Sequence, residues 1–162
     1  MIDLGTPYHA HPIKRARTTL SYLSVAFYGT SEEKLAYRRA INQAHAQVTS
    51  TAQSPIQYRG LDPNLQLWVA ACLFWGHLDV YEKLRGPMSK ADQARFYEFA
   101  KPLGTTLQVR PDMWPEDIDA FWQYWNSTLD TIVIPQDVKQ WLMQLVDLRF
   151  LGPVISFAFG SS

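Results

Sequence analysis

Hydrophobic residues recur with the 3.6-residue period of a helix along most of the chain, and no segment alternates convincingly as a strand would. The pattern predicts helices over residues 13–27, 31–48, 63–84 and 89–104, and two more that begin at Pro115 and Pro135. We therefore expect an all-α fold, a bundle of about six helices that forms a single domain over residues 1–162 and encloses an apolar pocket.

Residues that favour helix ends support these limits. Ser31 is predicted as the N-cap of the second helix, and Asp62 followed by Pro63 is a typical start for the third. Gly86 is expected to end the third helix, and Ser89 to cap the fourth. The segment 49–60 is polar and is predicted to form a loop.

The buried faces follow from the same period. The central helix is apolar nearly all round between residues 65 and 75, which is typical of an enclosed helix. Large rings at these faces either fill the core, the more common use, or form the walls of an apolar pocket. On the later helices the residues expected to face inward are Phe96, Phe99, Leu103, Ile118, Phe121, Trp122 and Trp125.

One face of the second helix combines an imidazole with apolar side chains. Tyr37, Ile41, His45 and Val48 recur at steps of four, four and three, so they share that face. A neutral imidazole in an apolar stripe is either a hydrogen-bonded core residue or a ligand to something held beside it. On spacing alone the core residue is the more common case.

The first helix carries a second candidate pair. Arg15 and Thr19 are four residues apart and face the same way. An arginine can hold a carboxylate or a propionate, and a hydroxyl can bond a small ligand. Taken alone, a solvated arginine and a threonine bonded to its own backbone are the more common interpretation.

The other histidines carry weaker signals. His77 and Asp79 point apart on a helix, and His77 is interpreted as structural. His9 and His11 stand in an irregular lead-in and resemble surface residues. The sequence contains no serine-nucleophile motif, phosphate-binding glycine loop or HExxH motif.

Composition narrows the class of protein. Fifteen basic residues balance fifteen acidic ones, so no global field would attract nucleic acid. The single Cys72 excludes an intrachain disulfide. The N-terminus lacks the apolar segment of a secretory signal, and no stretch reaches the roughly 20 apolar residues of a spanning helix. A cytoplasmic protein without a transmembrane segment is expected, and the apolar residues 150–162 leave association with a membrane surface open.

The order of six sequence segments along the chain is more specific to a protein family than any single motif. The segments are KRARTTLSYL, FYGT, AINQAHAQV, YRGLDPNLQLWVAACL, YEKLRGPMSKADQARFYEFAKPLG and PEDIDAFWQYW. Over residues 12–154 this order and spacing resemble the DUF2236 family, the group of latex-clearing rubber oxygenases and fungal MpaB-type oxygenases.

The resemblance implies an all-helical oxidoreductase that encloses haem b. By motif position His45 matches the axial histidine that binds the iron, and Arg15 and Thr19 match the catalytic residues beside the haem. Relatives of this kind act with dioxygen on apolar isoprenoid substrates, or cut a terpenoid side chain. We therefore expect an oxygenase of secondary metabolism that acts on an isoprenoid- or polyketide-like substrate with dioxygen or peroxide.

Three departures from the family pattern bear on this expectation. Rubber oxygenases have a lysine where this chain has Thr18, so ligation of the iron by a distal lysine is not carried over. Their Trp–Val–His block here ends in Ala70. Their catalytic acidic residue lies on a stretch that would precede Met1, and the domain is expected to be short at both ends relative to the family.

Two alternatives remain at the level of sequence. The helical pocket can serve a haem-free cyclase or isomerase that works by orienting an apolar substrate. The chain can also be a non-catalytic helical interaction module. In each case apolar ends would favour a homo-oligomer.

Overall fold

The computed structural model describes residues 12–54 and 56–146, and within these ranges the fold is all-α, as predicted. An isolated bridge between Thr49 and Arg59 is the one strand-like pairing of this part of the chain. The helices are α1 (Pro12–Tyr28), α2 (Ser31–His45), α3 (Pro63–Arg85), α4 (Lys90–Ala100), the single turn α5 (Pro102–Thr105), α6 (Ile118–Leu129) and α7 (Gln136–Val146).

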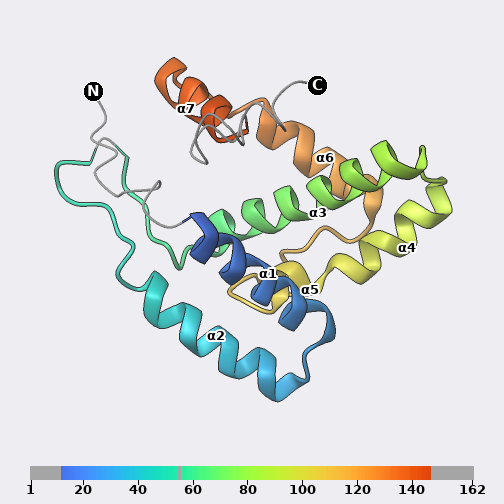
Figure 1. Cartoon of the computed structure of the whole chain (residues 1–162), viewed down its shortest axis with the longest axis horizontal. Helices are drawn as coiled ribbons and strands as arrows, with labels where there is room; N and C mark the ends of the chain where they lie inside the picture. Colours follow the sequence, from blue (N-terminus) through green and yellow to red (C-terminus); the bar gives the residue numbers. More distant parts are fainter. Residues whose placement is uncertain (1–11, 55, 147–162) are drawn as a thin grey trace.

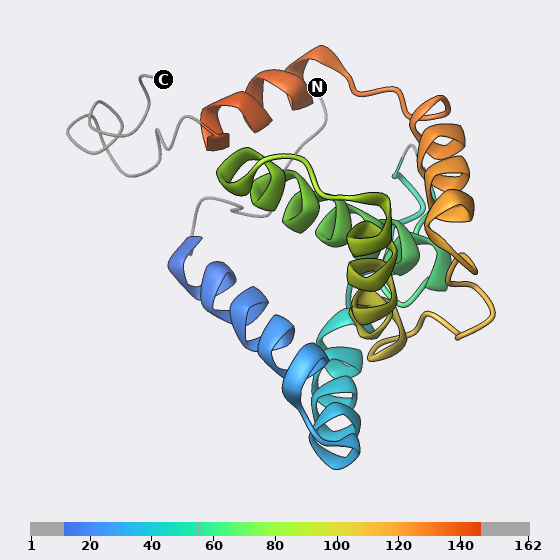
Figure 2. The same cartoon turned by 90° about the vertical axis from the view of Figure 1, so that its right-hand side faces the viewer.

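Helix α3 runs through the middle of the molecule (Figures 1 and 2). Helices α6 and α7 lie on one side of it, and α1 and α2 lie on the other. The short α5 contacts both α3 and α1, and it therefore joins the α1–α2 hairpin to the central helix. The Tyr22 hydroxyl on α1 donates to the Leu103 carbonyl of α5 and strengthens this junction.

The signals predicted for the two ends of α3 are confirmed, but the prediction that the helix is enclosed nearly all round is wrong, because Leu65, Val69 and Trp75 are 47%, 57% and 39% exposed. The Asp62 carboxylate accepts the backbone N–H of Asn64 at 2.7 Å, and Pro63 occupies the first turn. Gly86 follows the helix with a φ of 90°, a conformation that glycine adopts without strain. These local contacts explain why both ends of α3 could be located from sequence.

The predicted start of α2 is wrong by one residue. Thr30 is the N-cap and Ser31 is the first helical residue. The Thr30 hydroxyl accepts the backbone N–H of Glu33, and the Glu33 carboxylate accepts the backbone N–H of Thr30 at 2.7 Å, which completes a capping box. The helix also ends at His45, so Val48 lies beyond it and does not extend the predicted stripe.

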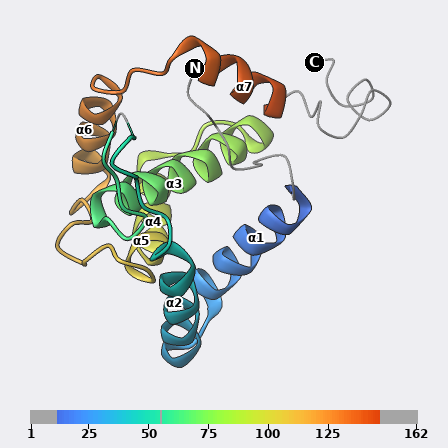
Figure 3. The same ribbon diagram turned by 90° about the vertical axis from the view of Figure 1, so that its left-hand side faces the viewer.

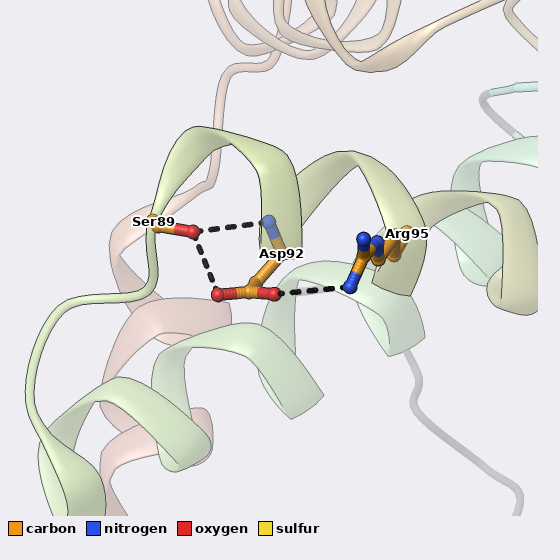
Figure 4. Close-up of polar contacts among 3 residues, drawn as sticks. All are labelled: Ser89, Asp92 and Arg95. Carbon is orange, nitrogen blue, oxygen red and sulfur yellow. Dashed lines mark hydrogen bonds and ion pairs between the residues drawn. The ribbon is translucent and has the colours of Figure 1, made fainter.

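Ser89 caps α4 as predicted, and Figure 4 shows its contacts with Asp92. The buried face of α4 differs from the prediction. Tyr97 is 1% exposed, whereas Phe99 is 50% exposed and stacks on Phe27 with ring centroids 5.0 Å apart. The helix ends at Ala100 and a new turn begins at Pro102, so a single helical face does not connect Phe99 with the buried Leu103.

Aromatic rings fill the core between α3, α4 and α6. Phe74, Tyr97 and Phe121 are the largest fully buried side chains, and the Phe74 and Phe121 rings meet edge to face at 4.7 Å. Trp125 is buried and stacks on the partly buried Trp68 at 4.9 Å. As predicted, Phe121 and Trp125 form the buried side of α6, with Ile118 and Trp122 packed against the same core.

None of the helices in the described ranges combines the length and the apolar character that crossing a membrane would require.

Candidate functional site

His45 is the last residue of α2 and is half-buried. Its Nδ1 atom is buried without a hydrogen-bond partner in the described part of the chain. A buried polar nitrogen that lacks a partner costs free energy, and such atoms are uncommon in folded proteins. The imidazole is therefore not a hydrogen-bonded core residue within the described part of the chain.

A pocket of about 460 Å³ opens beside this imidazole, within the size range of small-molecule sites. The turn after α2 and the start of α3 form its walls. The described residues that line it are His45, Ala46, Thr49, Arg59, Gly60, Leu61, Asp62 and Pro63. The aromatic rings of the core are not among them, so this pocket has a mixed polar and aliphatic lining.

Gly60 closes the loop onto the end of α2. Its backbone N–H donates to the Val48 carbonyl at 2.7 Å. A Cβ atom at this position would lie 2.9 Å from the Val48 Cβ and 3.0 Å from the His45 carbonyl oxygen. The absence of a side chain at Gly60 therefore allows the close approach that shapes the pocket.

The same loop is held against α3 by Gln66, whose residue is only 9% exposed. The Gln66 side-chain amide donates to the Gly60 carbonyl at 3.0 Å, and its carbonyl oxygen accepts the backbone N–H of Gln108 at 3.1 Å. Because the amide nitrogen and the oxygen of this buried side chain both have partners, Gln66 fixes α3, the loop at Gly60 and the segment at Gln108 relative to one another. It thereby supports the wall opposite His45.

Two charged residues line the pocket with different roles. The Asp62 carboxylate is committed to the backbone N–H groups at the start of α3. The Arg59 guanidinium is exposed, makes none of the ion pairs found in the described ranges, and can meet an anionic group of a ligand. Arg59 was not singled out from sequence, although it stands in one of the segments, YRGLDPNLQLWVAACL, on which the resemblance was based.

Arg15 and Thr19 both lie on α1, and Thr19 is exposed. The side chain of Arg15 lies outside the described part of the structure. Helices α1 and α2 diverge from their turn at Gly29, so the N-terminal end of α1 and the C-terminal end of α2 stand apart (Figure 3). No described residue around the His45 pocket belongs to α1, and the grouping of Arg15 and Thr19 with His45 stays a prediction.

His77 is held within its own helix. Its Nδ1 atom lies 2.6 Å from the Leu73 carbonyl oxygen, one turn earlier on α3, so Nδ1 carries the proton that this bond needs. This contact agrees with the structural role predicted for His77. His9 and His11 lie outside the described residues.

The described lining of the His45 pocket includes one imidazole, one guanidinium and one carboxylate. Residues 12–54 and 56–146 contain no group of three or more His, Cys, Asp or Glu side chains that could hold an ion by themselves. A histidine is one of the side chains that can hold haem iron, and an arginine can pair with a carboxylate such as a propionate. The buried Nδ1 of His45 marks an imidazole without a partner, and Arg59 supplies a cation at the same pocket.

Comparison with known proteins finds one family model and two similar proteins. Residues 4–159 match the family model described as "ER-bound oxygenase mpaB/B'/Rubber oxygenase, catalytic domain". The chain is 47% identical over 150 residues to the uncharacterized protein Rv2237 of Mycobacterium tuberculosis and, equally, to the uncharacterized protein Mb2261 of Mycobacterium bovis. The match covers 93% of this chain and 58% of each relative. No solved structure matches the chain.

Proposed function

The chain belongs to the family of MpaB-type and rubber oxygenase catalytic domains, and from this membership we propose that it is a haem-b-dependent oxygenase acting on an apolar substrate. The family consists of oxygenases, which is what supports an enzymatic role. The binding of haem, the residue that holds its iron and the class of substrate go beyond family membership, and each is a separate part of the proposal.

The observation that supports haem most directly is the unpartnered Nδ1 of His45 beside a pocket of about 460 Å³. A neutral imidazole nitrogen is a common axial ligand of haem iron. Coordination of the iron through Nδ1 would give this atom the partner that it lacks and would offset the cost of its burial.

Each nearby residue has a role in this proposal. His45 holds the iron, and Arg59 pairs with a propionate at the rim of the pocket. By their family positions, Arg15 and Thr19 would offset negative charge and donate a hydrogen bond near the haem, although neither is among the described residues that line the His45 pocket. The bound haem would supply the oxygen chemistry, with dioxygen or peroxide as the co-substrate.

The substrate proposed is apolar and isoprenoid- or polyketide-like. Large apolar side chains are exposed on α3, whose start forms a wall of the pocket, among them Leu65 and Val69. Apolar surface of this kind gains free energy when an apolar molecule covers it. The chain spans 58% of the length of its curated relatives. The proposed substrate class therefore refers to the site in this chain and not to the activity of those longer proteins.

Titration of the purified protein with hemin tests the proposal. A saturable Soret band with one haem per chain is expected, followed by oxygen uptake when an isoprenoid substrate is added to the reduced protein. If hemin produces only the spectrum of the free porphyrin at every ratio, the haem assignment is wrong.

A second candidate is a non-catalytic interaction module. The observation in its favour is the exposure of Leu84, at 77%, and of Val133, at 88%, neither of which lines the His45 pocket. Apolar side chains so exposed commonly mark an interaction surface. Reversible, concentration-dependent association in sedimentation equilibrium, without any bound chromophore, would favour this candidate.

A further inference from the structure

A second pocket, of about 290 Å³, lies between the first turns of α2 and the single turn α5. It shares no residue with the pocket beside His45. Its described lining consists of Ser31, Lys34, Leu35, Arg38, Pro102, Thr105 and Thr106. We propose that this pocket binds the phosphate group of a small molecule, or inorganic phosphate itself.

The charge of the lining is the first argument. Lys34 and Arg38 are four residues apart on α2 and therefore lie on one face, one turn from each other. Neither of them makes an ion pair within residues 12–54 and 56–146, and no acidic residue lines the pocket. Two adjacent cations repel each other, and a dianion between them would turn that repulsion into attraction.

The acidic residues at the start of α2 do not neutralise this pair. The Glu33 carboxylate accepts the backbone N–H of Thr30, and this bond lowers its pKa from the ordinary value. The capping box engages the Glu33 carboxylate at the start of the helix, and Glu33 is not among the described lining residues. The pocket therefore keeps its positive character.

Thr106 supplies the second, independent argument. This residue lines the pocket, is only 6% exposed, and has a buried Oγ1 atom without a hydrogen-bond partner among the described residues. A hydroxyl in that position can donate to an oxyanion, which would remove the cost of leaving it unpaired. Thr105 differs, because its hydroxyl already donates to the Lys101 carbonyl at 3.2 Å.

Arg38 is positioned before any anion arrives. Its Nη2 atom donates to the side-chain oxygen of Gln108 at 3.2 Å. The Gln108 amide in turn donates to the Asn42 side chain, one turn along α2 from Arg38. These neutral partners orient the guanidinium without cancelling its charge, so it retains donors for a phosphate.

A phosphate suits this arrangement better than a carboxylate does. A phosphate group near neutral pH carries close to two negative charges and offers three acceptor oxygens or more. The pocket offers two cations and one buried hydroxyl. The remaining apolar lining, Leu35 and Pro102, would contact the organic part of a phosphate ester.

Calorimetric titration of the full chain tests this proposal, with inorganic phosphate and glycerol 1-phosphate as separate probes and acetate as the carboxylate comparison. Saturable binding of a phosphate probe, with acetate weaker, is expected. Tighter binding of glycerol 1-phosphate would identify an ester as the natural ligand, and equal binding would identify phosphate itself. No saturable binding of either probe at millimolar concentration would overturn the proposal.

Variants separate a built site from general attraction. Lys34→Gln and Arg38→Gln each remove one charged donor and should weaken phosphate binding about tenfold. Arg39→Gln removes the same charge from an exposed neighbour outside the pocket and should leave the affinity within about twofold. Thr106→Val, which conserves shape, should weaken binding without removing charge. If Arg39→Gln weakens phosphate binding as much as Arg38→Gln does, the proposed site does not exist. Circular dichroism of each variant checks that it is folded.

Discussion

Gln66 and Gln108, separated by 42 residues in sequence, are joined by a hydrogen bond of 3.1 Å from the Gln108 backbone N–H to the Gln66 side-chain oxygen. Gln66 also donates to the Gly60 carbonyl, beside the His45 pocket, and Gln108 accepts from Arg38, in the phosphate pocket. One partly buried network of hydrogen bonds thus supports the walls of both pockets. The two pockets have no described lining residue in common, but the hydrogen bond between Gln66 and Gln108 connects the residues that support them.

Gln66→Leu should destabilise the protein by about 1–3 kcal/mol, because the Gln108 N–H and the Gly60 carbonyl would both lose a buried partner. Urea unfolding followed by circular dichroism measures the change. Gln123→Leu, at an exposed position on α6, is the matched control and should change stability by less than about 0.5 kcal/mol. Equal effects of the two substitutions would show that the Gln66 bonds contribute nothing specific.

Two glycines offer an opposite pair of predictions. Gly60→Ala should cost about 1–3 kcal/mol, since the new Cβ would lie 2.9 Å from the Val48 Cβ and 3.0 Å from the His45 carbonyl. Gly76→Ala should stabilise the protein by about 0.5–1 kcal/mol, because Gly76 is inside α3 and a Cβ there meets nothing within 4 Å. Thermal and urea unfolding measure both, and a stabilising Gly60→Ala would show that the loop does not need this close approach.

Local signals explain how much of the fold was predictable. Asp62, Gly86 and Ser89 satisfy backbone groups within a few residues of themselves, so their roles follow from the sequence around them. The start of α2 was misplaced because Thr30 and Ser31 are both good N-caps. The three-residue spacing from Thr30 to Glu33 decides between them through the capping box.

The site was less predictable, because its parts are distant in sequence. The face containing His45 could be identified from spacing, but the closure of Gly60 on Val48 and the bond from Gln108 to Gln66 depend on the tertiary fold. The phosphate pocket likewise joins α2 to Thr106 on another segment. Phe99 illustrates the same limit, since the break between α4 and α5 at Lys101 changes which residues face the core.

Stability should fall above about pH 10, because burial raises the pKa of Tyr22 above the ordinary value of 10.0. Above that pH the unfolded chain loses the tyrosine proton while the folded chain keeps it, so the free energy of unfolding decreases as pH rises. One such group contributes up to about 1.4 kcal/mol per pH unit. Below pH 10 both states are protonated and this contribution is fully present.

Urea unfolding at pH 9 to 11 measures this dependence. Tyr22→Phe should flatten the alkaline decline while it lowers stability at neutral pH by about 1 kcal/mol, through loss of the bond to the Leu103 carbonyl. The buried Tyr97, whose pKa burial also raises, should retain the remaining slope. Tyr28→Phe, at a ring that is 82% exposed, is the control and should reproduce the wild-type profile.

The two described histidines provide the sharpest test of the proposed haem. His45→Ala removes the imidazole whose Nδ1 is buried without a partner, and should abolish the Soret band that hemin produces in the wild type. His77→Ala removes an imidazole whose Nδ1 bonds the Leu73 carbonyl, and should leave the band largely intact while it lowers stability. Absorption spectra at matched hemin and protein concentrations measure both effects.

The folded state of each histidine variant must be checked by circular dichroism, since loss of structure would also remove the band. A folded His45→Ala protein that regains the band when imidazole is added in solution would show that the missing group is the ligand itself. A folded His45→Ala protein with an unchanged band would instead assign the iron to another residue. In that case the buried Nδ1 of His45 would have to be explained by a different ligand of the same pocket.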